Sequence, residues 1–143
     1  MQMKTLLALL LLIPSLSWGN SLLPLEKYIT QHDLDDPAVV EYIEYRCASV
    51  WYAIGTVIAK QEPALGEKFG ESALTIFIRL VSKKMLSDEI DINSASTIVN
   101  DSLTNIGNLY MDEMNSNWEK TGNYMMNTYV ETDSILCKEL LSE

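Results

Sequence analysis

The sequence predicts an all-α fold, a single-domain antiparallel four-helix bundle. Apolar residues recur at steps of three and four through most of the chain after residue 36, which is the pattern of amphipathic helices. Turn signals separate these periodic segments, and no segment of useful length alternates as a strand would. Four helices joined by short turns are typical of an up-down bundle. We expect the helices over about 37–60, 64–86, 94–120 and 124–141.

The first helix carries the strongest start signal. Asp36 precedes Pro37, which gives an N-cap side chain followed by proline at the first helical position. Residues 48–59 contain no charged side chain, so we expect the second half of this helix to be buried nearly all round. The uncharged run from 47 to 59 falls short of the roughly 20 residues that a membrane span needs. We therefore expect a central core helix and no membrane span in the exported chain.

Turn residues delimit the other three helices. Pro63 opens the second helix, and Asn93 or Ser94 is expected to cap the third. Residues 121–123 (Thr-Gly-Asn) end the third helix with residues typical of a helix stop. The fourth helix is weak at 131–134, where polar residues interrupt the apolar pattern.

Small residues flank the first turn on both sides. Gly55 and Ala59 precede it, and Gly66 and Gly70 follow it, at helical spacings. Because small side chains allow two helix backbones to approach closely, we expect the first and second helices to cross tightly here, with Gly70 as part of the contact.

The chain contains two cysteines, Cys47 and Cys137. In an antiparallel bundle the fourth helix lies beside the first, and these two residues then fall at matching levels. A redox or nucleophilic role is the alternative, but the chain has no C-x-x-C motif. We expect a structural disulfide, as is usual for an even pair of cysteines outside the cytoplasm.

The N-terminal segment 1–19 has the features of a cleaved signal peptide. Lys4 provides a positive charge, and residues 6–13 form an apolar run of the right length. Ser17 and Gly19 place small side chains at the −3 and −1 positions. We expect cleavage after Gly19 and export to the periplasm or the medium.

Two segments follow the predicted cleavage point: a lead-in segment at 20–36 and the helical domain at 37–143. All twenty acidic residues and nine of the ten basic ones remain, so this part carries a formal net charge of −11. A charge of this sign repels nucleic acid and anionic membranes. It favours a basic protein partner, or it serves only to keep the protein in solution.

The sequence contains no recognisable catalytic constellation. His32 is the only histidine, and no nucleophile-elbow, phosphate-loop or haem-attachment motif is present. We therefore expect a protein that is not an enzyme and that carries no resident cofactor.

One candidate binding face lies on the first helix. Tyr42 and Tyr45 stand off the main apolar stripe, beside Glu41 and Glu44. An exposed acidic and aromatic face suits protein recognition, although tyrosines also cover the edges of cores. This face suggests an inhibitor or immunity-like partner of a basic extracytoplasmic protein.

A second candidate is a group of methionines near the third turn: Met111, Met114, Met125 and Met126. Thioethers are soft ligands suited to Cu(I), although methionine is also an ordinary filler of irregular cores. These residues, with nearby aromatic side chains, support the alternative function, a periplasmic carrier of a small apolar ligand or soft metal.

Overall fold

The computed structural model describes residues 22–141. The predicted signal peptide and its cleavage point lie outside the described residues. Within this range the chain forms five helices: α2 (Leu25–Gln31), α3 (Pro37–Ile58), α4 (Pro63–Asp88), α5 (Ile92–Thr121) and α6 (Tyr129–Leu141). The all-α prediction is confirmed. No helix in this range combines the length and the apolar character needed to cross a bilayer.

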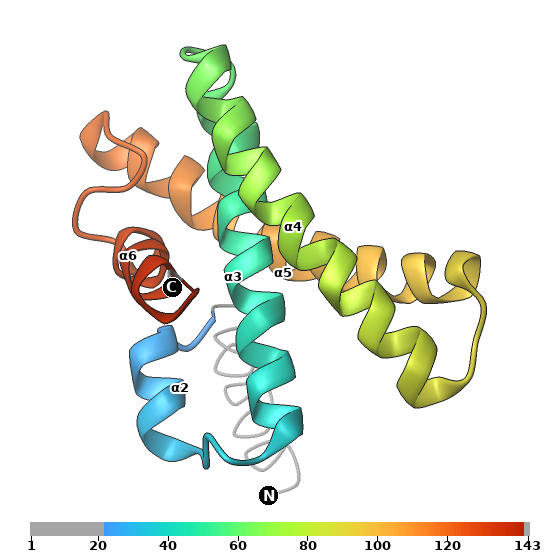
Figure 1. The fold of residues 1–143 in the computed structure, drawn as a ribbon. Helices are drawn as coiled ribbons and strands as arrows, with labels where there is room; N and C mark the ends of the chain where they lie inside the picture. Colours follow the sequence, from blue (N-terminus) through green and yellow to red (C-terminus); the bar gives the residue numbers. More distant parts are fainter. Residues whose placement is uncertain (1–21, 142–143) are drawn as a thin grey trace, which may run out of the picture.

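Helix α3 is the centre of the molecule and contacts α4, α5 and α6. Figure 1 shows α3 and α4 as an antiparallel pair, with α5 crossing both of them steeply instead of running alongside. Gly107 lies at this crossing, where an added Cβ atom would come within 3.2 Å of the ring of Tyr52 on α3. A helical bundle is therefore confirmed, while α5 departs from the parallel alignment of an up-down bundle.

The lead-in segment contains a helix of its own. Residues 25–31 form α2, which packs against α6 through the fully buried Leu25. The sequence analysis placed no helix in this segment, so α2 is an addition to the four predicted helices. The N-terminal end of the described chain is thus part of the folded core.

Side-chain caps fix the helix starts. The Asp36 carboxylate accepts a hydrogen bond from the backbone N–H two residues on, at 2.9 Å, as the sequence predicted for α3. The cap of α5 is Asp91, whose carboxylate accepts from the Ser94 N–H at 2.7 Å, so the choice of Asn93 or Ser94 was wrong. Gly122 ends α5 in the left-handed conformation (φ 72°), as its residue type indicates.

The last helix begins later than predicted, at Tyr129 instead of residue 124. The Asn123 side chain explains the difference, because its Oδ1 accepts from the N–H groups of both Met125 (2.9 Å) and Met126 (2.7 Å). This local pairing competes with helix formation. Asn127 then adopts a positive φ of 63°, which asparagine tolerates better than most residues.

The α3–α4 crossing is tight where the small residues meet. A Cβ atom added to Gly66 would lie 2.6 Å from the Ala59 Cβ and 2.8 Å from the Gly55 carbonyl oxygen. The predicted close approach is confirmed at these three residues. Gly70 is part of the contact through its backbone, because a Cβ atom added to Gly55 would lie 3.3 Å from the Gly70 nitrogen. A Cβ atom on Gly70 itself would meet nothing within 4 Å, so the contact does not require a glycine there.

These two glycines provide a matched pair of substitutions on one helix. We expect Gly66→Ala to lower the free energy of unfolding by about 1–3 kcal/mol, because the added methyl group overpacks the crossing. We expect Gly70→Ala to raise it by up to about 1 kcal/mol, because alanine favours the helix and the space is open. Urea unfolding followed by circular dichroism measures both. Equal effects of the two substitutions would contradict this description of the crossing.

The disulfide is present and joins α3 to α6. Cys47 and Cys137 are both fully buried, and their Cα atoms lie 5.4 Å apart. The predicted pairing is confirmed. Burial of the second half of α3 is less complete than predicted, because Tyr52 and Thr56 reach the surface.

Candidate functional site

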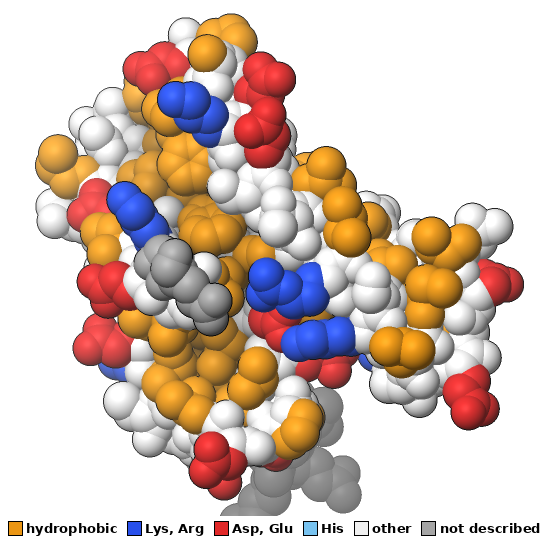
Figure 2. Space-filling model, in the orientation of Figure 1, with side chains coloured by type: hydrophobic (Ala, Val, Ile, Leu, Met, Phe, Trp, Pro, Cys, Tyr) orange, Lys and Arg blue, Asp and Glu red, His pale blue; other side chains and the backbone are white. Residues whose placement is uncertain are grey.

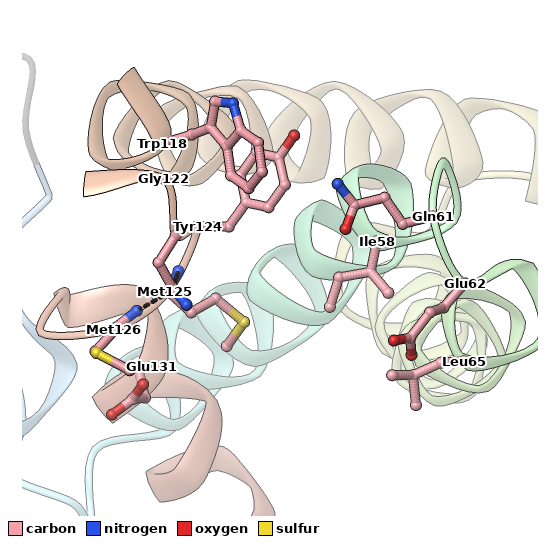
Figure 3. A pocket seen from close by; sticks show the side chains of 11 residues that line it. Ile58, Gln61, Glu62, Leu65, Trp118, Gly122, Tyr124, Met125, Met126 and Glu131 are labelled. Carbon is pink, nitrogen blue, oxygen red and sulfur yellow. Dashed lines mark hydrogen bonds between the residues drawn. The ribbon is translucent and has the colours of Figure 1, made fainter. Parts of the chain in front are cut away.

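A cleft in the described part of the chain has a volume of about 510 Å³. It lies where the α3–α4 turn meets the α5–α6 loop, as Figure 3 shows. Eleven residues line it: Ile58, Gln61, Glu62, Leu65, Trp118, Gly122, Asn123, Tyr124, Met125, Met126 and Glu131. These residues come from every helix except α2, so the cleft depends on the whole fold.

Two aromatic rings form one side of the cleft. Trp118 and Tyr124 stack with their ring centroids 4.4 Å apart and an interplanar angle of 19°. Figure 3 shows Ile58 and Gln61 on the opposite side, with the Met125 side chain extending between the two sides. The site therefore offers a stacked aromatic surface facing aliphatic groups, which suits an apolar ligand body.

The loop that carries Tyr124 is held by polar side chains. The Asn117 Nδ2 donates to the carbonyl oxygens of Asn123 (2.8 Å) and Met126 (3.2 Å). The Thr128 hydroxyl donates to the Met125 carbonyl at 2.6 Å. Because α5 and the start of α6 both anchor this loop, the aromatic side of the cleft is preorganised.

Among the residues that the structure describes, the only charged side chains that line the cleft are the carboxylates of Glu62 and Glu131. Figure 3 places them at different ends of the cleft, Glu62 beside Leu65 and Glu131 beside Met126. The electrostatic potential of the cleft therefore favours a positively charged ligand.

The predicted binding face on α3 is built differently from the expectation. Glu44 and Tyr45 are buried, because α4 packs along this side of α3. The Glu44 carboxylate forms an ion pair with Lys83, and Arg79 lies 3.8 Å from its other oxygen. Burial is also the main reason that the pKa of Tyr45 is raised. The exposed acidic face was therefore a wrong prediction at these two positions.

The other two residues of that face are half-buried. Lys84 lies 3.4 Å from the Glu41 carboxylate, so a basic residue of α4 also pairs with this glutamate. The Tyr42 hydroxyl accepts a hydrogen bond from Arg46 at 3.4 Å, and its ring contacts that of Tyr28. This segment of α3 thus serves helix packing, and its negative charge is largely compensated.

The four methionines are not brought together. Met114 is fully buried in the core, whereas Met126 is 57% exposed. Met125 and Met126 line the cleft, but Met111 and Met114 do not. Met111 packs against the core instead. Because Met114 is buried in the core and Met126 is exposed at the cleft, the structure gives no support to a metal site built from all four thioethers.

A buried ion pair that the sequence analysis did not identify lies beside the disulfide. Arg46 and Asp133 are both fully buried, and the Arg46 Nη2 lies 2.7 Å from the Asp133 Oδ2. The Tyr110 hydroxyl donates to the same carboxylate oxygen at 2.6 Å and accepts from the Arg46 Nε at 2.8 Å. These three residues, here called the buried triad, join α3, α5 and α6.

The triad also holds the N-terminal segment. Arg46 donates to the Leu23 carbonyl at 2.8 Å, and the Asp133 Oδ1 accepts from the Leu25 N–H at 2.9 Å. Burial alone would lower the pKa of Arg46, but Tyr110, Tyr42 and Asp133 outweigh it and raise the pKa above its usual value. Burial raises the pKa of Tyr110 well above its ordinary value. The triad is thus a charged, hydrogen-bonded core whose role is structural.

Sequence spacing could have revealed two members of the triad, Arg46 and Asp133. Arg46 precedes Cys47 directly, and Asp133 lies one helical turn before Cys137. A disulfide between these cysteines therefore brings an arginine and an aspartate to the same buried region.

The remaining titratable groups form no metal site within residues 22–141, where no three His, Cys, Asp or Glu side chains cluster. His32 is exposed, and its Nδ1 pairs with the Tyr28 carbonyl oxygen at 2.8 Å. Comparisons of the chain with protein-family models, with curated proteins and with solved structures found no match.

Proposed function

We propose that this is an exported binding protein that carries a small organic cation with an apolar body. The observation that supports it is the composition of the cleft: a stacked Trp118–Tyr124 pair, aliphatic side chains opposite, and carboxylates as the only charged groups. Of the two functions that the sequence suggested, this is the carrier of a small apolar ligand. The proposal adds that the ligand is positively charged.

The size of the cleft agrees with this proposal. Pockets for small molecules occupy about 300–1,000 Å³ and are mostly apolar, with a few polar groups that orient the ligand. The cleft, at about 510 Å³, lies within this range. Trp118 is 42% exposed, so part of its ring surface is available to a ligand.

The charge of the protein supports the same class of ligand. A cation close to a tryptophan or tyrosine ring is attracted by the negative face of that ring. Glu62 and Glu131 add two negative charges at the cleft, and the net charge of residues 20–143, −11, attracts cations over longer distances.

Tryptophan fluorescence provides the test. Residues 20–143 contain two tryptophans, Trp51 and Trp118, of which only Trp118 lines the cleft. In a Trp51→Phe variant, titration with decyltrimethylammonium is expected to give a saturable change in Trp118 emission. Decanol and decanoate, which share the chain but lack the positive charge, are expected to bind more weakly.

Two further substitutions locate the ligand. Glu131→Gln is expected to weaken binding of the cation by about two- to fivefold, as for a solvent-exposed ion pair. Glu119→Gln removes the same charge from an exposed position of α5 outside the cleft and is expected to have a smaller effect. The proposal fails if the cation gives no saturable change, or if the three probes bind equally.

A second candidate function is the inhibition of, or immunity to, a basic extracytoplasmic protein. It is supported by the hydrophobic residues Leu65, Trp118 and Met126, which line the cleft and are each at least 39% exposed. A lysine or arginine of a partner would use the same aromatic and acidic groups. Stoichiometric, salt-sensitive capture of one basic protein by the oxidised chain, abolished by Tyr124→Ala, would favour this function over the carrier.

A further inference from the structure

A second pocket lies on another face of the molecule, between α3, α4 and α6. It has a volume of about 260 Å³ and is lined by Trp51, Ser72, Thr75, Ile76, Arg79, Lys138 and Leu141. Ile76 is buried, and Trp51 is half-buried against the core. Figure 2 shows basic side chains over the middle of α4, next to a hollow with hydrophobic side chains on this face.

The charge of this pocket is the reverse of that of the cleft. Among residues 22–141, Arg79 from α4 and Lys138 from α6 are its only charged lining residues, and no carboxylate of this range lines it. The chain has twice as many acidic as basic residues. Two cations that share a pocket without an acidic lining residue therefore stand out from the rest of the surface.

Both cations have hydrogen-bonding capacity left. Lys83 already compensates the Glu44 carboxylate, and Arg79 lies 3.8 Å from Glu44, beyond hydrogen-bond distance. The Arg79 side chain is half exposed. No carboxylate among residues 22–141 forms an ion pair with Lys138.

We propose that this pocket binds a small monocarboxylate with an apolar body. Arg79 and Lys138 would hold the carboxylate, since a guanidinium donates two parallel hydrogen bonds to such a group. Trp51, Ile76 and Leu141 would contact the apolar part. The apolar contacts favour this ligand over a free inorganic anion, which would leave them in water.

The second tryptophan reports on this pocket independently of the cleft. In a Trp118→Phe variant of residues 20–143, titration with octanoate is expected to give a saturable change in Trp51 emission. Arg79→Gln and Lys138→Gln are each expected to weaken octanoate binding by about tenfold, the effect of losing one charge-assisted hydrogen bond. Lys68→Gln is the matched control, because it removes one positive charge from an exposed position of α4 outside the pocket. It is expected to leave the affinity nearly unchanged.

Three other ligands test whether both the carboxylate and the apolar chain of octanoate are needed for binding. Octanol and octylammonium are expected to bind more weakly than octanoate, and inorganic phosphate is expected not to displace it. Residues 142 and 143 follow Leu141, so the titration is repeated with a chain that ends at Leu141. Lack of octanoate binding by both chains would overturn the proposal. Equal binding of octanol, or displacement by equimolar phosphate, would also overturn it.

Discussion

Replacing Asp133 with alanine is expected to lower the free energy of unfolding by about 3–5 kcal/mol, because it leaves the buried Arg46 guanidinium without its carboxylate. The same change removes the acceptor for the Tyr110 hydroxyl and for the Leu25 N–H. Urea unfolding followed by circular dichroism at 222 nm measures the loss. A variant this unstable will also show a clearly lower Tm.

Glu139→Ala is the matched control, because it removes a carboxylate from an exposed position of the same helix. We expect it to change stability by less than about 0.5 kcal/mol. Replacing Arg46 and Asp133 together, by methionine and leucine, is expected to recover much of the lost stability, since no isolated charge remains in the core. A loss below 1 kcal/mol for Asp133→Ala would show that the triad contributes little to stability.

Removing the disulfide by Cys47→Ala and Cys137→Ala is expected to cost about 2–5 kcal/mol. The bridge links residues 90 apart in the sequence, so its absence frees a long loop in the unfolded chain. Both sulfur atoms are buried, so the two alanines also leave unfilled space beside the core.

Chemical reduction of the unchanged protein separates these two effects. Unfolding in the presence of a reductant opens the loop and keeps both cysteine side chains. We expect most of the loss to appear on reduction alone, with a smaller further loss in the double alanine variant. Equal stability of the oxidised and reduced proteins would contradict a stabilising role for the bridge.

The sequence was sufficient for those parts of the fold that local pattern determines. The period of the apolar residues located α3, α4 and α5, and Asp36 and Gly122 marked their ends correctly. The steep crossing of α5 over α3 was not predictable in the same way. It depends on the packing of α5 at Gly107 against Tyr52 of α3, two residues that are far apart in the sequence. Such long-range packing leaves little trace in the helical period.

The candidate sites show the same limit. The aromatic and methionine residues near the third turn were identified from their spacing, and four of them, with Trp118 and Tyr124 stacked, line the cleft. The α3 face was predicted wrongly, because helical period does not reveal which basic residues of α4 will lie against Glu44. The 260 Å³ pocket is lined by residues of α3, α4 and α6, which are far apart in the sequence, so no local pattern could predict it.

The hydrogen bonds of Leu23 and Leu25 to the buried triad set an order for the folding of a newly made chain. These residues are among the first of the described chain, whereas Asp133 lies 108 residues after Leu25. A chain that is synthesised from its N-terminus presents Arg46 long before its carboxylate partner Asp133 has been made. The N-terminal segment can therefore reach its native position only after α6 has been made as well.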